Sequence, residues 1–183
     1  MKLIATYFNK MRGGKKAPPR APLHEIFWSS LGGFIGIYLI YEIAHYNTLN
    51  MEDSLFLVGS FGASAILIYG IPQSPYAQPR NLIGGHIISA IVGVSCALLF
   101  ASQPEIAAAL AVSIALAFMH ISRTIHPPGG ATALIAVIGS DKIHQMSYWY
   151  VFSPIFVGAM IMLLVAVLVN NLSTSRRYPD YWL

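Results

Sequence analysis

The sequence predicts an all-α polytopic membrane protein with four to six transmembrane segments. Hydrophobic residues make up 56% of the 183 residues and charged residues only 10%, whereas an ordinary soluble domain carries about 25% charge. The mean hydropathy is +0.61. The basic residues concentrate at the amino terminus, which holds six lysines and arginines within positions 1–25. This composition excludes a disordered chain, a coiled coil and a soluble enzyme.

Six apolar runs follow one another along the chain, and a membrane-crossing helix needs about 20 apolar residues. The runs cover residues 26–45, 54–71, 82–101, 105–122, 131–139 and 148–170. The fifth run is too short to cross a membrane as a helix. The runs predict one transmembrane domain at 26–172, between a basic tail at 1–25 and a short tail at 173–183. We expect both tails in the cytosol.

An internal repeat divides this domain into halves at about 26–101 and 105–170. Residues 62–67 read GASAIL and residues 130–135 read GATALI, 68 positions later. Each half then contains a helix, a broken segment and a second helix. Three crossings in each half would make the two halves inverted, which is a common arrangement in transporters.

The charges between the runs favour six crossings with both termini in the cytosol. Arg80 and Arg123 would then lie in cytosolic loops, and the acidic residues would lie in outer loops, as the positive-inside rule requires. The alternative has four full helices with the second and fifth segments re-entrant, and it would place both arginines outside. We expect the inner membrane of a bacterium. An organellar membrane is the alternative, because the amino terminus is basic and poor in acidic residues.

The strongest motif lies at residues 124–134, where two prolines and two glycines interrupt the helical pattern. Pro127 and Pro128 suit the first turn of a helix, which would run to Gly139 over roughly 15 Å, half of a bilayer. Its amino terminus would carry free N–H groups and the positive end of the dipole. Gly129 and Gly130 would leave that backbone uncovered, so the motif predicts an anion site.

The first half repeats this arrangement more weakly at residues 59–65, where a second half-helix would begin at Gly62. Hydroxyl donors would come from Ser60, Ser64, Thr124 and Thr132. The predicted substrate-binding residues are Gly62, Ala63, Ser64, Thr124, His126, Gly129, Gly130, Ala131 and Thr132. The alternative is that these small residues only allow helices to pack closely.

Four further residues are candidates for guiding the anion or for coupling its movement to a proton. Arg80 and Arg123 would attract an anion to the cytosolic mouth, or they would only fix the topology. His86 and His126 would couple a proton, because an imidazole titrates near neutrality. Glu42 either lines the pathway or reaches the interface. No histidine pair has the spacing of a metal site, and we expect no metal, no cofactor and no nucleic-acid partner.

The motif TIHPPGGATAL at 124–134 strongly resembles the HPP family of integral membrane proteins. GASA at 62–65 and QPRNLIGGH at 78–86 are also similar to motifs of that family, and the resemblance covers about 25–172. It implies a membrane-embedded fold that is usually described as four helices. It also implies a transporter, and cyanobacterial and plastid relatives are linked to nitrite transport.

Together these features predict the transport of a small inorganic anion, with nitrite as the substrate that the resemblance implies. The alternatives are a passive anion channel and a non-catalytic scaffold or assembly subunit. An enzyme is not expected, because the sequence has no paired carboxylates, no Ser/His/Asp spacing and no nucleotide-binding loop. The lipid bilayer is the expected environment, and a bundle this small is expected to form a homo-oligomer that shields a pore.

Overall fold

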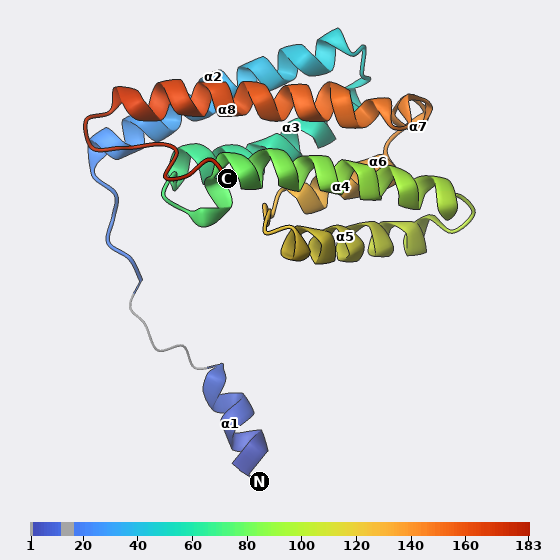
Figure 1. The fold of residues 1–183 in the computed structure, drawn as a ribbon, viewed down its shortest axis with the longest axis horizontal. Coiled ribbons are helices and arrows are strands. Elements are labelled where there is room, and N and C mark those ends of the chain that lie inside the picture. Colours follow the sequence, from blue (N-terminus) through green and yellow to red (C-terminus); the bar gives the residue numbers. More distant parts are fainter. Residues whose placement is uncertain (1, 12–16) are drawn as a thin grey trace.

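The computed structural model describes residues 2–11 and 17–183, and every regular element in these ranges is a helix (Figure 1). The predicted all-α polytopic class is confirmed. The elements are α1 (Lys2–Lys10), α2 (Leu23–Tyr46), α3 (Met51–Ala65), η1 (Ile66–Gly70), η2 (Pro75–Ala77), α4 (Pro79–Leu99), α5 (Pro104–Ile121), α6 (Gly129–Ile138), α7 (Asp141–Met146), η3 (Val151–Phe156) and α8 (Val157–Leu172).

The helices begin where the local chemistry favours a start. Pro79 and Pro104 occupy the first positions of α4 and α5, where a missing N–H group leaves no helical bond unmade. The side chain of Asn50 accepts a hydrogen bond of 2.8 Å from the backbone N–H of Asp53 and so caps α3. These signals place the starts of three helices within a few residues of the predicted runs.

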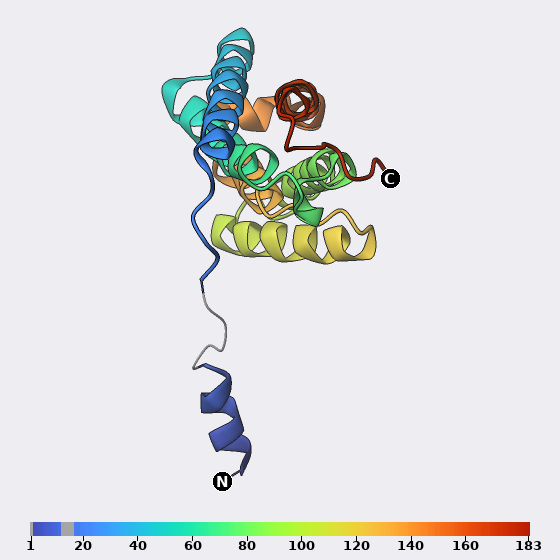
Figure 2. The ribbon, with the colours of Figure 1, turned by 90° about the vertical axis from the view of Figure 1, so that its left-hand side faces the viewer.

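The bundle has two groups of helices. α2 packs against α3 and α8, whereas α4, α5 and α6 pack against one another, as Figures 1 and 2 show from two directions. The larger apolar core lies mainly among α2, α3, α4 and α8. The smaller core contains Ala107, Ala111 and Ala115 of α5, which are buried at four-residue spacing against α4 and α6. Small side chains let these helices approach closely.

Five helices in the described ranges are long and apolar enough to cross a membrane. They are Leu23–Tyr46, Met51–Gly70, Pro79–Leu99, Pro104–Ile121 and Val151–Leu172. The shorter apolar helix α6 has ten residues, which span about 15 Å. The Arg176 guanidinium lies 2.7 Å from the Glu25 carboxylate, so the start of α2 and the residues after α8 lie at the same end of the bundle.

The predicted break in the second segment is wrong. Residues 51–65 form one α-helix, which continues through η1 to Gly70. The two glycines at 59 and 62 lower helix propensity by only about 1 kcal/mol each, and no proline accompanies them. In the other half, Pro127 and Pro128 remove two N–H donors, and the helix does stop there. The predicted half-length helix is therefore found in the second half of the domain, whereas the second segment is one continuous helix of residues 51–70.

The carboxyl-terminal residues fold back onto the bundle instead of forming a free tail. The Tyr178 hydroxyl donates to the Ala77 carbonyl at 2.7 Å, and the backbone N–H of Asp180 donates to Gln78 Oε1 at 2.9 Å. Tyr178 is buried. Residues 173–183, which the sequence predicts as a tail, therefore cover the segment between η1 and α4.

Candidate functional site

The site forms around the segment at 122–128, which joins α5 to α6 and lies against α4. Asn81 Nδ2 of α4 donates to the Ile125 carbonyl at 2.7 Å. A Cβ atom at Gly85 would stand 2.5 Å from His126 Cβ and 2.9 Å from the Thr124 carbonyl oxygen. Only glycine therefore allows the segment to approach α4 this closely, and this contact fixes the position of His126.

Five polar side chains meet at this point, and we call them the histidine cluster: Ser60 and Ser64 of α3, His86 of α4, His126 of the connecting segment and Thr132 of α6. Ser64 Oγ lies 2.9 Å from the Nε2 atoms of both His86 and His126. His86 Nδ1 lies 2.7 Å from Thr132 Oγ1, which lies 3.0 Å from Ser60 Oγ. One continuous chain of hydrogen bonds therefore joins three helices.

The cluster is closed off from solvent. Each of its five side chains belongs to a residue that is at most 2% exposed. The ring of Phe61 stacks on His86 with centroids 4.7 Å apart, and the two imidazole centroids are 5.0 Å apart. His126 Nδ1 lies 2.8 Å from the Tyr76 carbonyl oxygen, and Ser60 Oγ donates to the Pro128 carbonyl at 3.1 Å. Every polar atom of the cluster therefore has a partner.

The sequence predicted an uncovered amino terminus for α6, and this prediction is wrong. The N–H groups of Gly129, Gly130 and Thr132 donate to the carbonyls of residues 126, 127 and 128, at 2.8, 3.0 and 3.2 Å. A Cβ atom at Gly129 would stand 2.6 Å from Ser89 Oγ and 3.0 Å from the Gly85 carbonyl oxygen. The proline turn itself satisfies these three donors, and α4 covers Gly129, so the three N–H groups are not free to bind an anion in this conformation.

The small residues of the two repeats divide between the cluster and the outer surface. Ser64 and Thr132 occupy equivalent positions in the repeats, and they contact opposite nitrogens of the same ring, His86. Gly62 is partly exposed, and Ala63 and Ala131 are exposed on the outside of the bundle. The latter three residues do not contribute to the cluster, because a helix turns neighbouring positions toward different sides.

The structure does not bring the other predicted residues into the cluster. Arg80 Nη2 donates to the Ser122 carbonyl at 2.8 Å, and Arg123 is exposed at a left-handed turn with φ of 58°. Thr124 is buried and its hydroxyl lies 2.7 Å from that of Ser122. Glu42 is exposed on α2. The two arginines therefore lie around the end of α5 and not beside the histidines.

Two tyrosines belong to the site although the sequence did not single them out. Tyr76 contributes its backbone carbonyl to His126. Every residue type has a backbone carbonyl, so the sequence could not indicate this contact. The Tyr150 hydroxyl donates to the Thr132 carbonyl at 3.1 Å, and Tyr150 is fully buried. Tyr150 stands at the end of an apolar run, where an interfacial role is the usual expectation. Its contact with α6 became visible only in the fold.

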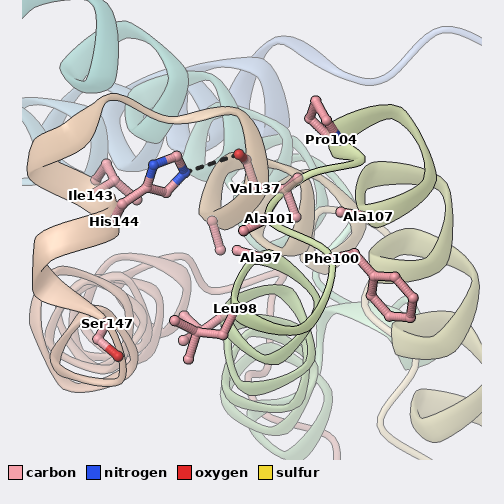
Figure 3. A pocket seen from close by; sticks show the side chains of 12 residues that line it. Ala97, Leu98, Phe100, Ala101, Pro104, Ala107, Val137, Ile143, His144 and Ser147 are labelled. Carbon is pink, nitrogen blue, oxygen red and sulfur yellow. Dashed lines mark hydrogen bonds between the residues drawn. The ribbon is translucent and has the colours of Figure 1, made fainter.

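A cavity of about 290 Å³ lies at the opposite end of α6 (Figure 3). Its wall is apolar and comes from the end of α4, the start of α5, the end of α6 and α7. His144 points along its edge and is hydrogen-bonded through Nε2 to the Val137 carbonyl at 3.0 Å. None of the residues predicted for the anion site lines this cavity.

The chain is similar to known membrane proteins over most of its length. The model of the family described as "HPP, transmembrane region" matches residues 18–179. One Dictyostelium discoideum protein is 50% identical over 179 residues, which are 96% of this chain and 57% of the relative. A second protein of that organism is 47% identical over 184 residues, 98% of this chain and 64% of the relative.

Both relatives are named only as transmembrane proteins, and this chain spans about three fifths of their length. No solved structure matches the chain. The family match covers the whole bundle, including the 124–134 motif and the histidine cluster that it builds. The chain is an integral membrane protein and belongs to the HPP transmembrane-region family.

Proposed function

We propose that the protein carries a small inorganic anion across the membrane together with a proton, and that the histidine cluster couples the two. The supporting observation is the buried pair of imidazoles, each 2.9 Å from the Ser64 hydroxyl. The partners of the two rings are hydroxyls and a carbonyl, with no carboxylate among the described contacts. A buried imidazolium without a counter-charge costs several kcal/mol. Protonation of the pair therefore requires an anion from outside.

The start of α6 favours an anion for a second reason. α6 begins three residues after His126, and the positive end of its dipole lies at that terminus. An anion there would face both the dipole and a protonated His126. Nitrite is the substrate we propose, and its choice rests on the family resemblance, because the names of the two relatives contain no substrate. On this proposal the protein is a carrier, and neither an enzyme nor a cofactor-dependent protein.

The closed amino terminus of α6 gives the proposal a mechanical requirement. The hydrogen bonds from Gly129, Gly130 and Thr132 to the proline turn must give way before an anion can accept them. We therefore infer that the first turn of α6 moves during transport. Gly130 has space for this, because a Cβ atom there would meet only Val112 Cγ1, at 3.9 Å.

The orientation that we propose places both termini in the cytosol. Arg80 and Arg123 then lie at the cytosolic face, in agreement with the positive-inside rule, and so does the loop that carries Tyr76. A bacterial inner membrane was expected from the sequence. The two relatives come from an amoeba, so the comparisons favour a eukaryotic membrane as the alternative. A homo-oligomer stays part of the proposal.

Uptake into proteoliposomes tests the proposal directly. The full chain is reconstituted, and nitrite uptake is measured with and without a pH gradient, with nitrate, formate and chloride as competitors. We expect saturable uptake that a proton gradient stimulates. His126→Gln should abolish the stimulation, whereas His120→Gln is the matched control, because His120 is exposed on α5. Folded, inserted protein that moves none of these anions would refute the proposal.

One rival receives support from a specific observation. The histidine cluster is fully hydrogen-bonded in the described residues, and none of its members lines the 290 Å³ cavity, which also suits a membrane scaffold in which the cluster only joins helices. A scaffold would show no flux in the assay above. A passive channel would show flux that does not depend on the proton gradient and that does not saturate.

A further inference from the structure

We propose that the histidine cluster is a directional proton relay from Ser60 to His126, in which the Ser64 hydroxyl is the necessary link between the two imidazoles. The inference rests on the proposed function for the source of the proton. It goes beyond that function by assigning a tautomer to each ring and a direction to each hydrogen bond.

The direction is fixed at one end by a backbone carbonyl. The Tyr76 carbonyl oxygen can only accept, so His126 Nδ1, at 2.8 Å, must carry the proton. In the neutral ring His126 Nε2 is then bare and must accept. Its partner at 2.9 Å is the Ser64 hydroxyl, which has a single proton and gives it to His126.

The remaining bonds follow from that assignment. Because the proton of Ser64 is already used, the 2.9 Å bond to His86 must be donated by His86 Nε2. The Nδ1 atom of neutral His86 is then bare and accepts from Thr132 Oγ1 at 2.7 Å. Thr132 has then used its proton, so the single proton of Ser60 is shared in a three-centre bond between Thr132 Oγ1 at 3.0 Å and the Pro128 carbonyl at 3.1 Å. The two histidines are therefore opposite tautomers, and the bonds that link the five side chains all run in the direction of Tyr76.

A proton can move along this chain without any change in the total number of bonds to hydrogen. The conjugate acid of the anion gives its proton to Ser60, and the proton of Ser60 passes to Thr132. The proton of Thr132 forms the N–H bond at His86 Nδ1, and the proton on His86 Nε2 passes to Ser64. The proton of Ser64 then forms the N–H bond at His126 Nε2. At every step one bond to hydrogen breaks and one forms, so the net products are the anion, which supplies the counter-charge, and the His126 imidazolium.

The surroundings keep the relay from exchanging protons with other groups. Within the described residues, the other hydrogen-bonding partners of the five side chains are backbone carbonyls, and the Tyr150 hydroxyl is directed at the Thr132 carbonyl. Phe61 covers the face of His86. In the part of the chain that the structure describes, no Asp, Glu, Lys or Arg side chain hydrogen-bonds to the five. Their burial separates the five side chains from bulk water.

The His126 end of the relay lies next to the surface. Tyr76, whose carbonyl holds His126, is 44% exposed in the loop between η1 and α4, whereas Ser60 stands near the middle of the Met51–Gly70 span. A relay with these ends connects the middle of the bilayer to one face. Displacement of the Tyr76 carbonyl would let water accept the Nδ1 proton of His126 and return the ring to the neutral form.

Nitrogen-15 NMR of the histidine-labelled full chain in bilayers tests the tautomers without any transport. At neutral pH we expect the proton of His126 on Nδ1 and that of His86 on Nε2, with the signals assigned through His86→Gln and His126→Gln. The same tautomer at both rings, or both assignments reversed, would overturn the relay. This measurement stands even if the protein carries no nitrite.

Reconstituted Ser64→Ala tests the link itself, with Ser113→Ala as control because Ser113 is an exposed serine of α5. Ser64→Ala should lower proton-driven nitrite uptake by about tenfold or more, whereas Ser113→Ala should leave it unchanged. Unchanged proton-driven uptake in Ser64→Ala would overturn the relay. Absence of any nitrite uptake in the wild type would instead refute the proposed function, and the NMR result would then decide on the relay alone.

Discussion

Arg176 holds together the end of the bundle where the first and last helices meet, and its removal should be severely destabilising. Its guanidinium donates five hydrogen bonds, at 2.7–3.0 Å, to the Glu25 carboxylate and carbonyl, the Ser29 hydroxyl, the Tyr69 carbonyl and Asn170 Oδ1. The side chain is completely buried, whereas that of Glu25 is 23% exposed. Arg176→Ala therefore leaves several buried acceptors without a donor.

The expected loss follows from what each acceptor can do afterwards. Hydrogen bonds to charged groups contribute about 1.5–3 kcal/mol each, but these five are not additive. Glu25 can turn to water, and the Tyr69 carbonyl keeps the Ser29 hydroxyl as a donor at 2.8 Å. Removing one partner of a buried ion pair costs about 3–5 kcal/mol, and we expect Arg176→Ala to fall in that range. The free energy of unfolding of Arg176→Lys should lie between those of the wild type and Arg176→Ala, because lysine keeps the charge but lacks the planar fork of the guanidinium.

The adjacent arginine provides a matched control. Arg177 is exposed, so Arg177→Ala should change the free energy of unfolding by no more than about 0.5 kcal/mol. Both variants can be compared by reversible unfolding in mixed micelles, followed by circular dichroism. Equal stabilities of Arg176→Ala and Arg177→Ala would show that the guanidinium contacts do not hold this end of the bundle.

Two further paired substitutions test the packing at α6. Gly93→Ala should lower the free energy of unfolding by about 1–3 kcal/mol, because its Cβ atom would overlap the α6 backbone. Gly62→Ala should raise it by up to about 1 kcal/mol, because a Cβ atom there meets nothing within 4 Å. Equal free energies of unfolding for the two variants would exclude the close contact at Gly93. Asp53→Ala should destabilise the α6–α7 turn by about 1–3 kcal/mol, because the fully buried carboxylate accepts from the backbone N–H and hydroxyl of Ser140. Hydrogen exchange should show faster opening of that turn in Asp53→Ala and not in Glu52→Ala, which changes an exposed neighbour.

The sequence predicts the apolar spans well because the membrane demands length and apolarity, and both are local properties. The break before α6 could be predicted for the same reason, since Pro127 and Pro128 remove N–H donors wherever they stand. The prediction of a break at Gly59 and Gly62 was wrong, because glycine permits a break in a helix but does not cause one. Whether a helix continues through a glycine depends on its neighbours, and α3 keeps its backbone bonds throughout.

The site was predictable by residue type and not by arrangement. His126, His86, Ser64 and Thr132 were all candidates, but the sequence placed them around an open helix end. In the fold they bond to one another, because α3, α4 and α6 meet there. The contact between Ser64 and both rings joins residues 22 and 62 positions away along the chain, and no local pattern encodes such separations.

The position of Arg176 also governs when the protein can finish folding during synthesis. Its partner Glu25 precedes it by 151 residues, and at about 5–20 residues per second a ribosome needs roughly 8–30 s to produce that stretch. During this time α2 is in the membrane without α8, against which it packs in the finished bundle. A nascent chain therefore waits with the side of α2 that later meets α8 still unpacked, and the bundle closes only after α8 has been synthesised.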